Sequence, residues 1–247
     1  MGALHKGHIS LIQRCKEENE VSICSIFVNP TQFSDPADLA RYPRTLEADI
    51  KLLEKAGCQV VFTPKSEEIY PKNQKKAPQL GKITEVLEGF YRPGHFEGVA
   101  QVVQRFFEII KPHKAYFGSK DYQQVLVIKK LAASMPSAPE IISCPIIREP
   151  DGLAMSSRNM LLNAEERQIA SLLPELMRSA AMIAKTKGIA AARNAVQELV
   201  KQQALMKLEY YEICHPETLE PATEAAGAVS LIAVFVGRIR LIDNYLL

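Results

Sequence analysis

The chain has 247 residues, which is enough for one large domain or two smaller ones with a sizeable hydrophobic core. Hydrophobic residues make up 47% and charged residues 23%, as in ordinary globular proteins. The net charge of +2 excludes the strongly basic surface of a protein that binds a long nucleic acid. No apolar run approaches the roughly 20 residues of a membrane helix and no secretory signal pattern is present, so we expect a soluble protein with no membrane partner.

Helical and strand-like segments alternate over residues 1–149. The period of the apolar residues predicts helices over 9–19, 46–57, 98–112 and 120–134, and strands over 21–28, 58–64, 114–118 and 140–149. Between them lie a proline-rich polar loop over 29–45 and a lysine-containing solvated loop over 71–79. Strands separated by helices predict parallel βαβ units, and hence a Rossmann-like, doubly wound α/β sheet. In such a sheet ligands bind at the carboxyl ends of the strands.

The pattern changes after the stretch "DGLAMSSRN". A mostly helical region over 163–204 is interrupted at Pro174 and Gly188, and strand-like runs follow over 207–215, 229–236 and 238–246. Helices followed by strands predict a small α+β domain. We therefore expect a Rossmann-like domain over 1–149, a C-terminal domain over 150–247, and a hinge near Gly152.

The five cysteines are widely spaced and include no CxxC pair. This pattern is typical of neither a disulfide framework nor a zinc site, so we expect a protein of the reducing cytoplasm.

The opening octet "MGALHKGH" carries two histidines, His5 and His8, at the start of the first predicted helix. Gly7 allows a ligand to approach the backbone, and a helix N-terminus offers free N–H groups and a positive dipole end. Both imidazoles can donate hydrogen bonds to phosphate oxygens. A metal site would need a third ligand, and none stands out in the sequence.

Three further loops carry polar side chains suited to an anionic ligand. The stretch "AMSSRN" offers two hydroxyls and Arg158 in a predicted mobile loop, and "FGSKDYQQ" offers Lys120 as a point charge and Asp121 as a magnesium or ribose partner. The stretch "FVNPTQF" supplies Asn29 and Gln32, whose amides suit a substrate with a hydroxyl beside a carboxylate. Each loop taken alone is also compatible with an ordinary solvated turn.

Taken together, these stretches resemble a known family. The HxGH turn and the distant Ser-Ser-Arg loop resemble the HIGH and KMSKS pair of the nucleotidyltransferases. The set "MGALHKGH", "FVNPTQF", "DLARYPRT", "YRPGHFEGV", "FGSKDYQQ", "REPDGLAMSSRN" and "RLIDN" is similar to the pantoate–β-alanine ligase family, in order and spacing along the whole chain. The resemblance implies that pantoate and ATP form pantoyl adenylate, which β-alanine converts to pantothenate and AMP.

The resemblance also implies the roles of individual residues. His8 would be the general acid, and the other catalytic residues would be His5, Lys120, Ser156, Ser157 and Arg158. Gln32 and Gln124 would bind pantoate. The ATP site would comprise Met1, Gly2, Ala3, Leu4, His5, Lys6, Gly7, His8, Gly118, Ser119, Lys120, Asp121, Ile147, Met155, Ser156, Ser157 and Arg158.

Further expectations follow from the same resemblance. Mg²⁺ would bridge the phosphates; Glu47 and Asp49 lie on a helix that could help to hold it, but we assign no metal ligand. The protein would be a cytoplasmic homodimer, and its small domain would act as a lid that shields the adenylate from water.

Family members also carry a leading segment whose strand ends just before the residue equivalent to Met1. A central parallel strand pairs on both edges, and each unpaired buried backbone group costs about 1–3 kcal/mol. We therefore expect a protein that lacks this strand to be unstable or catalytically impaired.

Two alternatives remain open at the level of sequence. One is an adenylyl- or cytidylyltransferase acting on a phosphorylated substrate such as phosphopantetheine, although such a site would carry more lysine and arginine than the two glutamines here. The other is a non-catalytic binding module related to an aminoacyl-tRNA synthetase, against which the near-neutral charge counts.

Overall fold

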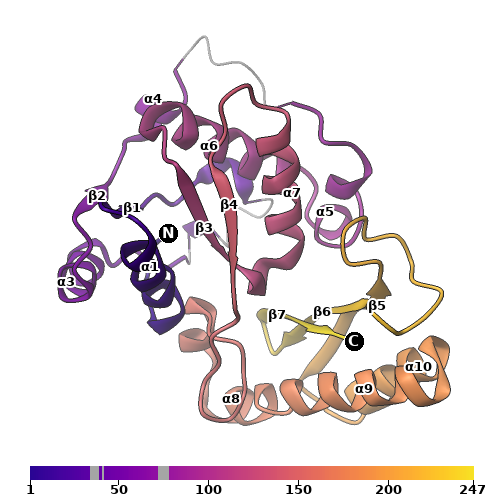
Figure 1. Ribbon diagram of the computed structural model, residues 1–247. Helices are drawn as coiled ribbons and strands as arrows, with labels where there is room; N and C mark the ends of the chain where they lie inside the picture. Colours follow the sequence, from indigo (N-terminus) through magenta and orange to yellow (C-terminus); the bar gives the residue numbers. More distant parts are fainter. Residues whose placement is uncertain (34–38, 41, 72–77) are drawn as a thin grey trace. The chain divides into compact units, whose positions relative to one another are not determined.

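The structure, a computed structural model, describes residues 1–33, 39–40, 42–71 and 78–247 (Figure 1). It divides the chain into two compact units, Met1–Pro145 and Ile146–Leu247. The remaining residues, 34–38, 41 and 72–77, fall within the two predicted loops at 29–45 and 71–79, so those parts of the prediction lie outside the described residues. Among the described helices, none combines the length and the apolar character needed to cross a membrane.

The first unit consists of helices and short parallel strands in alternation. Helix α3 ends as predicted, because Gly57 adopts a left-handed conformation (φ 73°) and closes the last turn. The strands are β1 (Ile23–Ser25), β2 (Val60–Phe62), β3 (Lys114–Gly118) and β4 (Glu140–Cys144). The α-helices are α1 (Lys6–Glu18), α3 (Leu46–Ala56), α4 (Ser66–Ile69), α5 (Glu88–Tyr91), α6 (His95–Ile110) and α7 (Tyr122–Ala133), and the 3₁₀ helices are η1 (Pro30–Gln32), η2 (Gly81–Thr84) and η3 (Ser119–Asp121).

The parallel strands are joined in two pairs. Strand β1 pairs with β2, and β3 pairs with β4. Beside β1, the Met1 nitrogen donates a hydrogen bond to the Ser25 carbonyl (2.8 Å) and the Phe27 N–H donates one to the Met1 carbonyl (3.1 Å). The predicted parallel pairing is thus present, but within the described residues the strands do not form one continuous sheet, because β1 and β3 both border a cavity instead of pairing with each other.

Helix α1 is fixed at both ends. At its start, the hydrophobic cluster of Leu4, Ile12, Cys24, Ile26 and Leu53 packs the turn and the helix against β1 and α3. Burying such side chains contributes about 1.5–3 kcal/mol each. The start of α1 therefore has a defined direction relative to the carboxyl end of β1.

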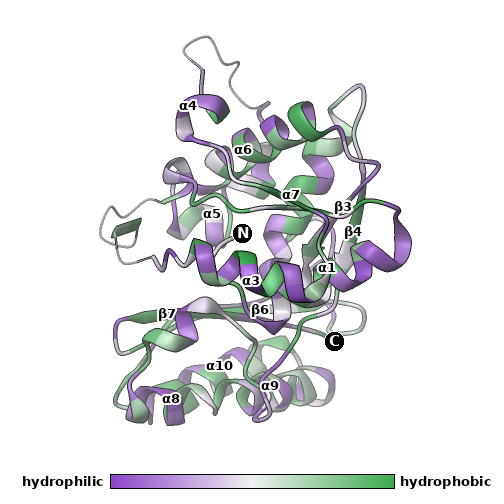
Figure 2. Cartoon of the chain, turned by 90° about the vertical axis from the view of Figure 1, so that its left-hand side faces the viewer, coloured by the Kyte–Doolittle hydropathy of each residue, from purple (hydrophilic) through white to green (hydrophobic). Residues whose placement is uncertain are grey.

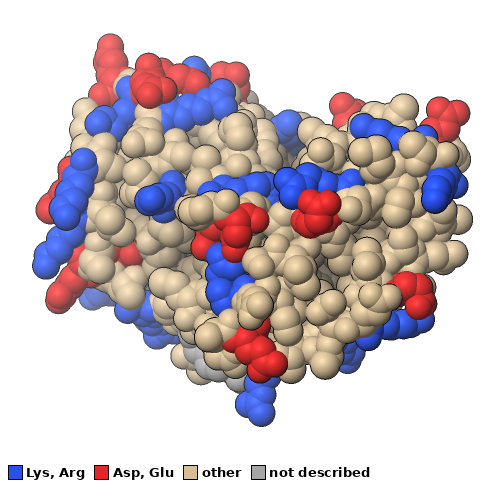
Figure 3. Space-filling view, turned by 90° about the horizontal axis from the view of Figure 1, so that it is seen from below, with Lys and Arg blue, Asp and Glu red and all other residues tan. Residues whose placement is uncertain are grey.

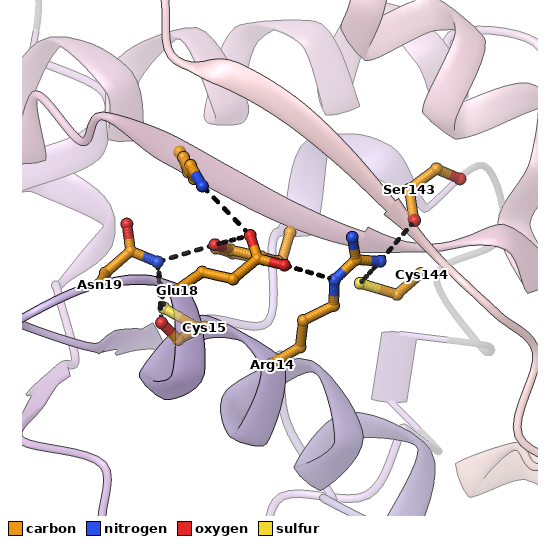
Figure 4. A network of polar contacts seen from close by, with 8 residues as sticks. Arg14, Cys15, Glu18, Asn19, Ser143 and Cys144 are labelled. Carbon is orange, nitrogen blue, oxygen red and sulfur yellow. Dashed lines mark hydrogen bonds and ion pairs between the residues drawn. The ribbon is translucent and has the colours of Figure 1, made fainter.

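A polar network holds the other end of α1 (Figure 4). The Arg14 guanidinium binds Glu18 (2.9 Å) and donates to the Ser143 carbonyl (3.2 Å) on β4. On β3, the Tyr116 hydroxyl donates to Glu18 (2.9 Å) and accepts a hydrogen bond from Asn19 (2.7 Å). Hydrogen bonds from Arg14 and then Tyr116 lower the pKa of Glu18 to about 2, so the carboxylate stays ionised and the network holds α1 against β3 and β4 at neutral pH.

The second unit is a three-stranded antiparallel sheet covered by helices. Pro174 lies in the first turn of α9, where its missing N–H breaks no helical hydrogen bond, and Gly188 (φ 90°) separates α9 from α10, so both predicted interruptions are confirmed. The elements are η4 (Ser157–Leu161), α8 (Ala164–Ala170), α9 (Leu173–Lys187), α10 (Ile189–Lys201), β5 (Met206–Cys214), β6 (Val229–Val236) and β7 (Ile239–Leu246), with the sheet in the order β5-β6-β7.

The core of this unit lies between its sheet and its helices. Apolar side chains of α9 and α10, among them Met177 and Val196, pack with Ile213 and Ile232 of the sheet. Along these helices hydrophobic and hydrophilic residues alternate with the helical period (Figure 2). On the surface, Lys and Arg are interspersed with Asp and Glu (Figure 3), as in the Arg178–Glu175 ion pair of α9 (2.6 Å).

The turn at Gly152, the predicted hinge, belongs wholly to the second unit. Its N–H donates to the Glu149 carbonyl (2.8 Å), its carbonyl accepts from Arg148 (3.0 Å), and a β-bridge joins Arg148 to Ala154. The change of unit comes earlier, between Pro145 and Ile146.

Candidate active site

His5 and His8 cap the first helix and support each other. The Gly7 N–H donates to Nδ1 of His5 (3.1 Å), and the His5 N–H donates to Nδ1 of His8 (3.3 Å). The ring centroids are 4.1 Å apart. Since both Nδ1 atoms accept hydrogen bonds, each neutral ring carries its proton on Nε2. The capping interaction thus selects the tautomer that presents Nε2–H.

His8 is neutral at physiological pH. Burial lowers its pKa to about 3, and electrostatic interactions with His5 and Lys120 lower it further. Nε2–H is therefore a permanent hydrogen-bond donor, and it can stabilise negative charge on a phosphate oxygen without first taking up a proton.

A cavity of about 910 Å³ begins at this turn and runs between β1 and β3. α1 and α6 also contribute to its walls. The predicted site residues that line it come from three separate stretches of the sequence, and they are Met1, His8, Gln32, Gly118, Asp121 and Gln124. Two of them lie in the first turn of a helix, His8 in α1 and Gln124 in α7. The 3₁₀ helix η1, which follows β1, carries Gln32, and η3, which follows β3, carries Asp121, as predicted for an α/β sheet.

Other predicted residues of the first unit surround the cavity without lining it. Lys120 is near enough to His8 to lower the histidine's pKa. Gly2, Ala3 and Leu4 are buried beneath the turn, and the side chain of Lys6 is exposed. Ser119 shares a hydrogen bond with Ser143 (2.8 Å), which joins the ends of β3 and β4.

Gln32 is held in place by α6. Its backbone carbonyl oxygen accepts a hydrogen bond from Nδ1 of His95 (2.8 Å). The side chain of Asn29, the residue just before η1, donates a hydrogen bond to the Gly98 carbonyl (3.1 Å). Gly98 permits a close approach, because a Cβ there would lie 2.8 Å from the Gln32 nitrogen and would collide with the Thr31 carbonyl. The 3₁₀ turn η1 is therefore seated on α6 by hydrogen bonds and by a required glycine.

The sequence assigned no role to His95 or Gly98, although both lie in the stretch "YRPGHFEGV". The helix was predicted to begin at Gly98, whereas α6 begins at His95, and the three-residue spacing then places both residues on one helix face. What they face, the loop at Gln32, is more than 60 positions away in the chain and could not be read from the local pattern.

The adjacent glutamines of α7 have different roles. Gln123 is buried; its amide donates to the carbonyls of Ile83 and Val86 (both 2.8 Å), and its oxygen accepts from the Glu88 N–H (3.0 Å). Gln124 instead lines the cavity. Only Gln124 is thus available to a ligand there, in keeping with the role that the resemblance implies.

Two buried histidines predict a specific loss of stability in acid. The pKa of His95 is lowered to about 4, mainly by burial, and that of His8 to about 3, whereas a histidine in the unfolded chain titrates near 6.5. As the pH falls below 6.5 the unfolded chain binds these protons first, so the free energy of unfolding decreases. Between pH 7 and 4.5 we expect a loss of about 2 kcal/mol for each histidine.

Urea unfolding at a series of pH values, followed by circular dichroism, measures this loss. His95→Gln should flatten the pH dependence of the unfolding free energy by one proton. An unaltered slope in His95→Gln would show that the histidine titrates normally in the folded protein.

The predicted Ser-Ser-Arg loop lies in the second unit and is ordered by its own contacts. Ser156 caps η4, its hydroxyl accepting from the Arg158 N–H (3.2 Å), and Ser157 is buried. The Met155 N–H donates to the Ile147 carbonyl (2.9 Å), so the two residues predicted to line the nucleoside site are neighbours. The structure forms this stretch as a hydrogen-bonded hairpin followed by a 3₁₀ helix.

The acidic residues of α3 do not form a metal site. Glu47 is exposed, and both carboxylate oxygens of Asp49 accept backbone hydrogen bonds, from Ala3 and Leu4. In the described part of the chain, no three His, Cys, Asp or Glu side chains gather as metal ligands. Three acidic residues line the cavity, and of these only Asp121 was predicted as a site residue; the others are Glu18 and Glu20.

Comparison with known proteins identifies the family. The sequence profile described as pantoate-beta-alanine ligase matches residues 1–246. The chain belongs to this family. The resemblance inferred from seven short stretches is thereby confirmed, and the chain is an enzyme of the ligase class.

Individual relatives agree with this assignment. The pantothenate synthetase of Bacteroides fragilis is 45% identical over 247 residues, which cover 99% of this chain and 88% of that protein. The crystal structure of pantothenate synthetase from Thermus thermophilus matches with a TM-score of 0.93 and 42% identity, covering 99% of this chain and 90% of that one.

A third similar structure is a complex with small molecules. It is the pantoate-beta-alanine ligase from Francisella tularensis, complexed with beta-gamma ATP and beta-alanine; it matches with a TM-score of 0.83 and 38% identity, covering 100% of this chain and 87% of that one. These similarities confirm the predicted α/β fold with a smaller C-terminal unit.

Proposed function

We propose that the protein joins pantoate to β-alanine with consumption of ATP, through a pantoyl adenylate, and so forms pantothenate, a precursor of coenzyme A. The observation that carries the proposal is the cavity in which His8, Gln32 and Gln124 meet at the strand ends. Family membership and the ligands of the Francisella tularensis relative support the same substrates.

In the first step a pantoate carboxylate oxygen attacks the α-phosphorus of ATP. A new O–P bond forms, the bond from the α-phosphorus to the bridging oxygen breaks, and pyrophosphate leaves with that electron pair. Negative charge grows on the phosphate oxygens as this happens. Nε2–H of His8 and the ammonium group of Lys120 stabilise that charge, and the amides of Gln32 and Gln124 hold the hydroxyls and the carboxylate of pantoate.

In the second step the free amine of β-alanine attacks the acyl carbon of the adenylate. The C–N bond forms, the bond to the AMP oxygen breaks, and the amine loses a proton to give the amide. The adenylate is a mixed anhydride that water hydrolyses, so the reaction benefits from a site closed to solvent. We assign that closure to the second unit, as the family resemblance implies.

The assignments in the second unit rest on the resemblance. Ser156, Ser157 and Arg158 would contact the triphosphate, since a guanidinium binds phosphate oxygens in a fork. Ile147 and Met155 would contact the nucleoside together with Gly118. The hydrogen bond between the Met155 N–H and the Ile147 carbonyl keeps these two residues side by side, which supports a shared role in nucleoside binding.

Mg²⁺ fits the chemistry of the cavity. This ion usually binds one or two carboxylates together with substrate phosphates and water. Asp121 lines the cavity, and its carboxylate would be the protein ligand. When bound, the ion would neutralise charge on the leaving pyrophosphate.

The homodimer and the cytoplasmic location are likewise part of the proposal and rest on the family resemblance.

Isotope exchange between pyrophosphate and ATP tests the proposed function. We expect labelled pyrophosphate to enter ATP only when pantoate is present, because the exchange requires reversible formation of the adenylate. Exchange that requires phosphopantetheine in place of pantoate would identify the rival transferase, and a folded protein that shows no exchange with either would be a binding module.

A further inference from the structure

Asp49 is a buried carboxylate directly beneath the HxGH turn. It lies in the first turn of α3 and is 2% exposed. Oδ2 accepts a hydrogen bond from the Ala3 N–H (2.9 Å), and Oδ1 accepts from the Leu4 N–H (2.7 Å) and from the Thr45 hydroxyl (3.1 Å). One side chain therefore binds two successive amides that are 45 and 46 positions away in the sequence.

The backbone that Asp49 binds is strained. Ala3 has φ 48°, in the left-handed region that residues with a Cβ rarely adopt. A charged acceptor makes shorter and stronger hydrogen bonds than a neutral one, so two such bonds can hold a conformation that the residue itself disfavours. The next residue, Leu4, is anchored in the hydrophobic cluster with Ile12 and Leu53.

This arrangement fixes the backbone that directly precedes His5 and the start of α1. Ala3 and Leu4 directly precede His5, whose ring accepts from Gly7 and whose N–H donates to Nδ1 of His8. A change in the direction of the chain at Ala3 therefore alters both hydrogen bonds that select the Nε2–H tautomer. Few other contacts could substitute, because a donor pair in a buried turn needs a matching pair of acceptors.

We propose that Asp49 is a positioning residue: it fixes the backbone entering the HxGH turn and thereby aims Nε2–H of His8 at the reacting phosphate. The inference rests on the proposed function for its kinetic consequence. Asp49 acts through the turn, with both oxygens already engaged, and is not a ligand of Mg²⁺.

The first test replaces Asp49 with asparagine, which keeps the size but places an NH₂ group against one of the two N–H donors. We expect pantoate-dependent exchange in Asp49→Asn to lose at least about tenfold in kcat, as one missing directed hydrogen bond in a transition state does. The KM for pantoate should stay within a factor of about two, since Gln32 and Gln124 are untouched. Glu47→Gln, which removes a charge from the same helical turn, is the matched control and should keep the unaltered rate.

Titration with Mg²⁺ separates the positioning role from a metal role. For a positioning residue the Mg²⁺ concentration at half-maximal rate stays the same in Asp49→Asn, and excess Mg²⁺ does not restore the rate. Recovery of the rate at high Mg²⁺ would overturn the proposal, as would a kcat equal to that of the unaltered protein.

Ala3→Gly in the Asp49→Asn background supplies a rescue. Glycine adopts φ 48° without steric cost, so the double variant should regain at least about threefold of the lost rate. A double variant no faster than Asp49→Asn would contradict the assigned role of the backbone strain.

A readout without turnover keeps the inference distinct from the proposed function. In the unaltered protein, nitrogen NMR should find Nδ1 of His8 unprotonated and Nε2 protonated; in Asp49→Asn, folded by circular dichroism, these resonances should shift toward a mixture of tautomers. Unchanged resonances would refute the role of Asp49. A shift without pantoate-dependent exchange in the unaltered protein would instead refute the proposed function alone.

Discussion

His8→Ala is expected to slow formation of the adenylate at least about 10²-fold, the usual effect of removing one preorganised donor from a developing oxyanion. Because burial holds the pKa of His8 at about 3, the ring is a neutral donor throughout the physiological range. The loss should therefore be nearly the same at about pH 6.5 and about pH 8.5, both far above that pKa. Single-turnover measurement of the rate at saturating ATP and pantoate gives the value at each pH.

The matched control is His215→Ala, at an exposed histidine just after β5 that does not line the cavity. It should leave the single-turnover rate unaltered, which separates the loss of a specific donor from the loss of any imidazole. Single-turnover rates in His8→Ala equal to those of the unaltered protein would remove His8 from the mechanism. A loss confined to low pH would mean that His8 acts in its charged form, contrary to its buried environment.

Gly98→Ala is expected to damage both stability and pantoate binding. The added methyl group would collide with the backbone at Thr31 and Gln32, which cannot move as a flexible side chain could. Overpacking of this kind typically costs about 1–3 kcal/mol, here about 3 because the colliding atoms belong to the backbone. Displacement of η1 should also move the Gln32 amide and raise the KM for pantoate about tenfold, equivalent to about 1.4 kcal/mol of binding free energy.

Gly89→Ala provides the comparison, since a methyl group there would collide with the Thr84 carbonyl. Both variants should lower the unfolding free energy in urea. Only Gly98→Ala should also raise the KM for pantoate, because a methyl group at Gly98 meets the backbone of Gln32 whereas one at Gly89 does not. Equal KM values in the two variants would mean that the packing of η1 against α6 does not position Gln32.

Much of the fold could be predicted from local patterns. The strand at Lys114–Gly118 and the strand at Val229–Val236 have the predicted bounds, and the helix ending at Gly57 stops at the predicted glycine. These elements are decided by apolar periodicity and by the backbone freedom of glycine, which are local properties. The short helices α4 and α5 were not predicted, because four residues are too few to show a helical period.

The site was predicted as a set of residues but not as an arrangement. The family motifs pointed to His8, Gln32 and Gln124, and the structure gathers these three around one cavity. The family resemblance selected Gln124, but the local sequence gives no reason to prefer it to Gln123, because the two glutamines differ only in the direction that each faces from α7. That direction depends on packing against η2 and α5, elements 35 to 40 positions away.

The sequence by itself determined the order of helices and strands, the two interruptions at Pro174 and Gly188, and the chemistry of the residues that handle phosphate and acid. Those properties follow from periodicity, backbone preference and side-chain functional groups, all of which reside in neighbouring residues. Only the tertiary structure decided that His8 is neutral, that Asp49 binds the backbone before His5, and that His95 and Gly98 seat Gln32. Burial and hydrogen bonding between distant segments produce these features, and neither is encoded in any local stretch of sequence.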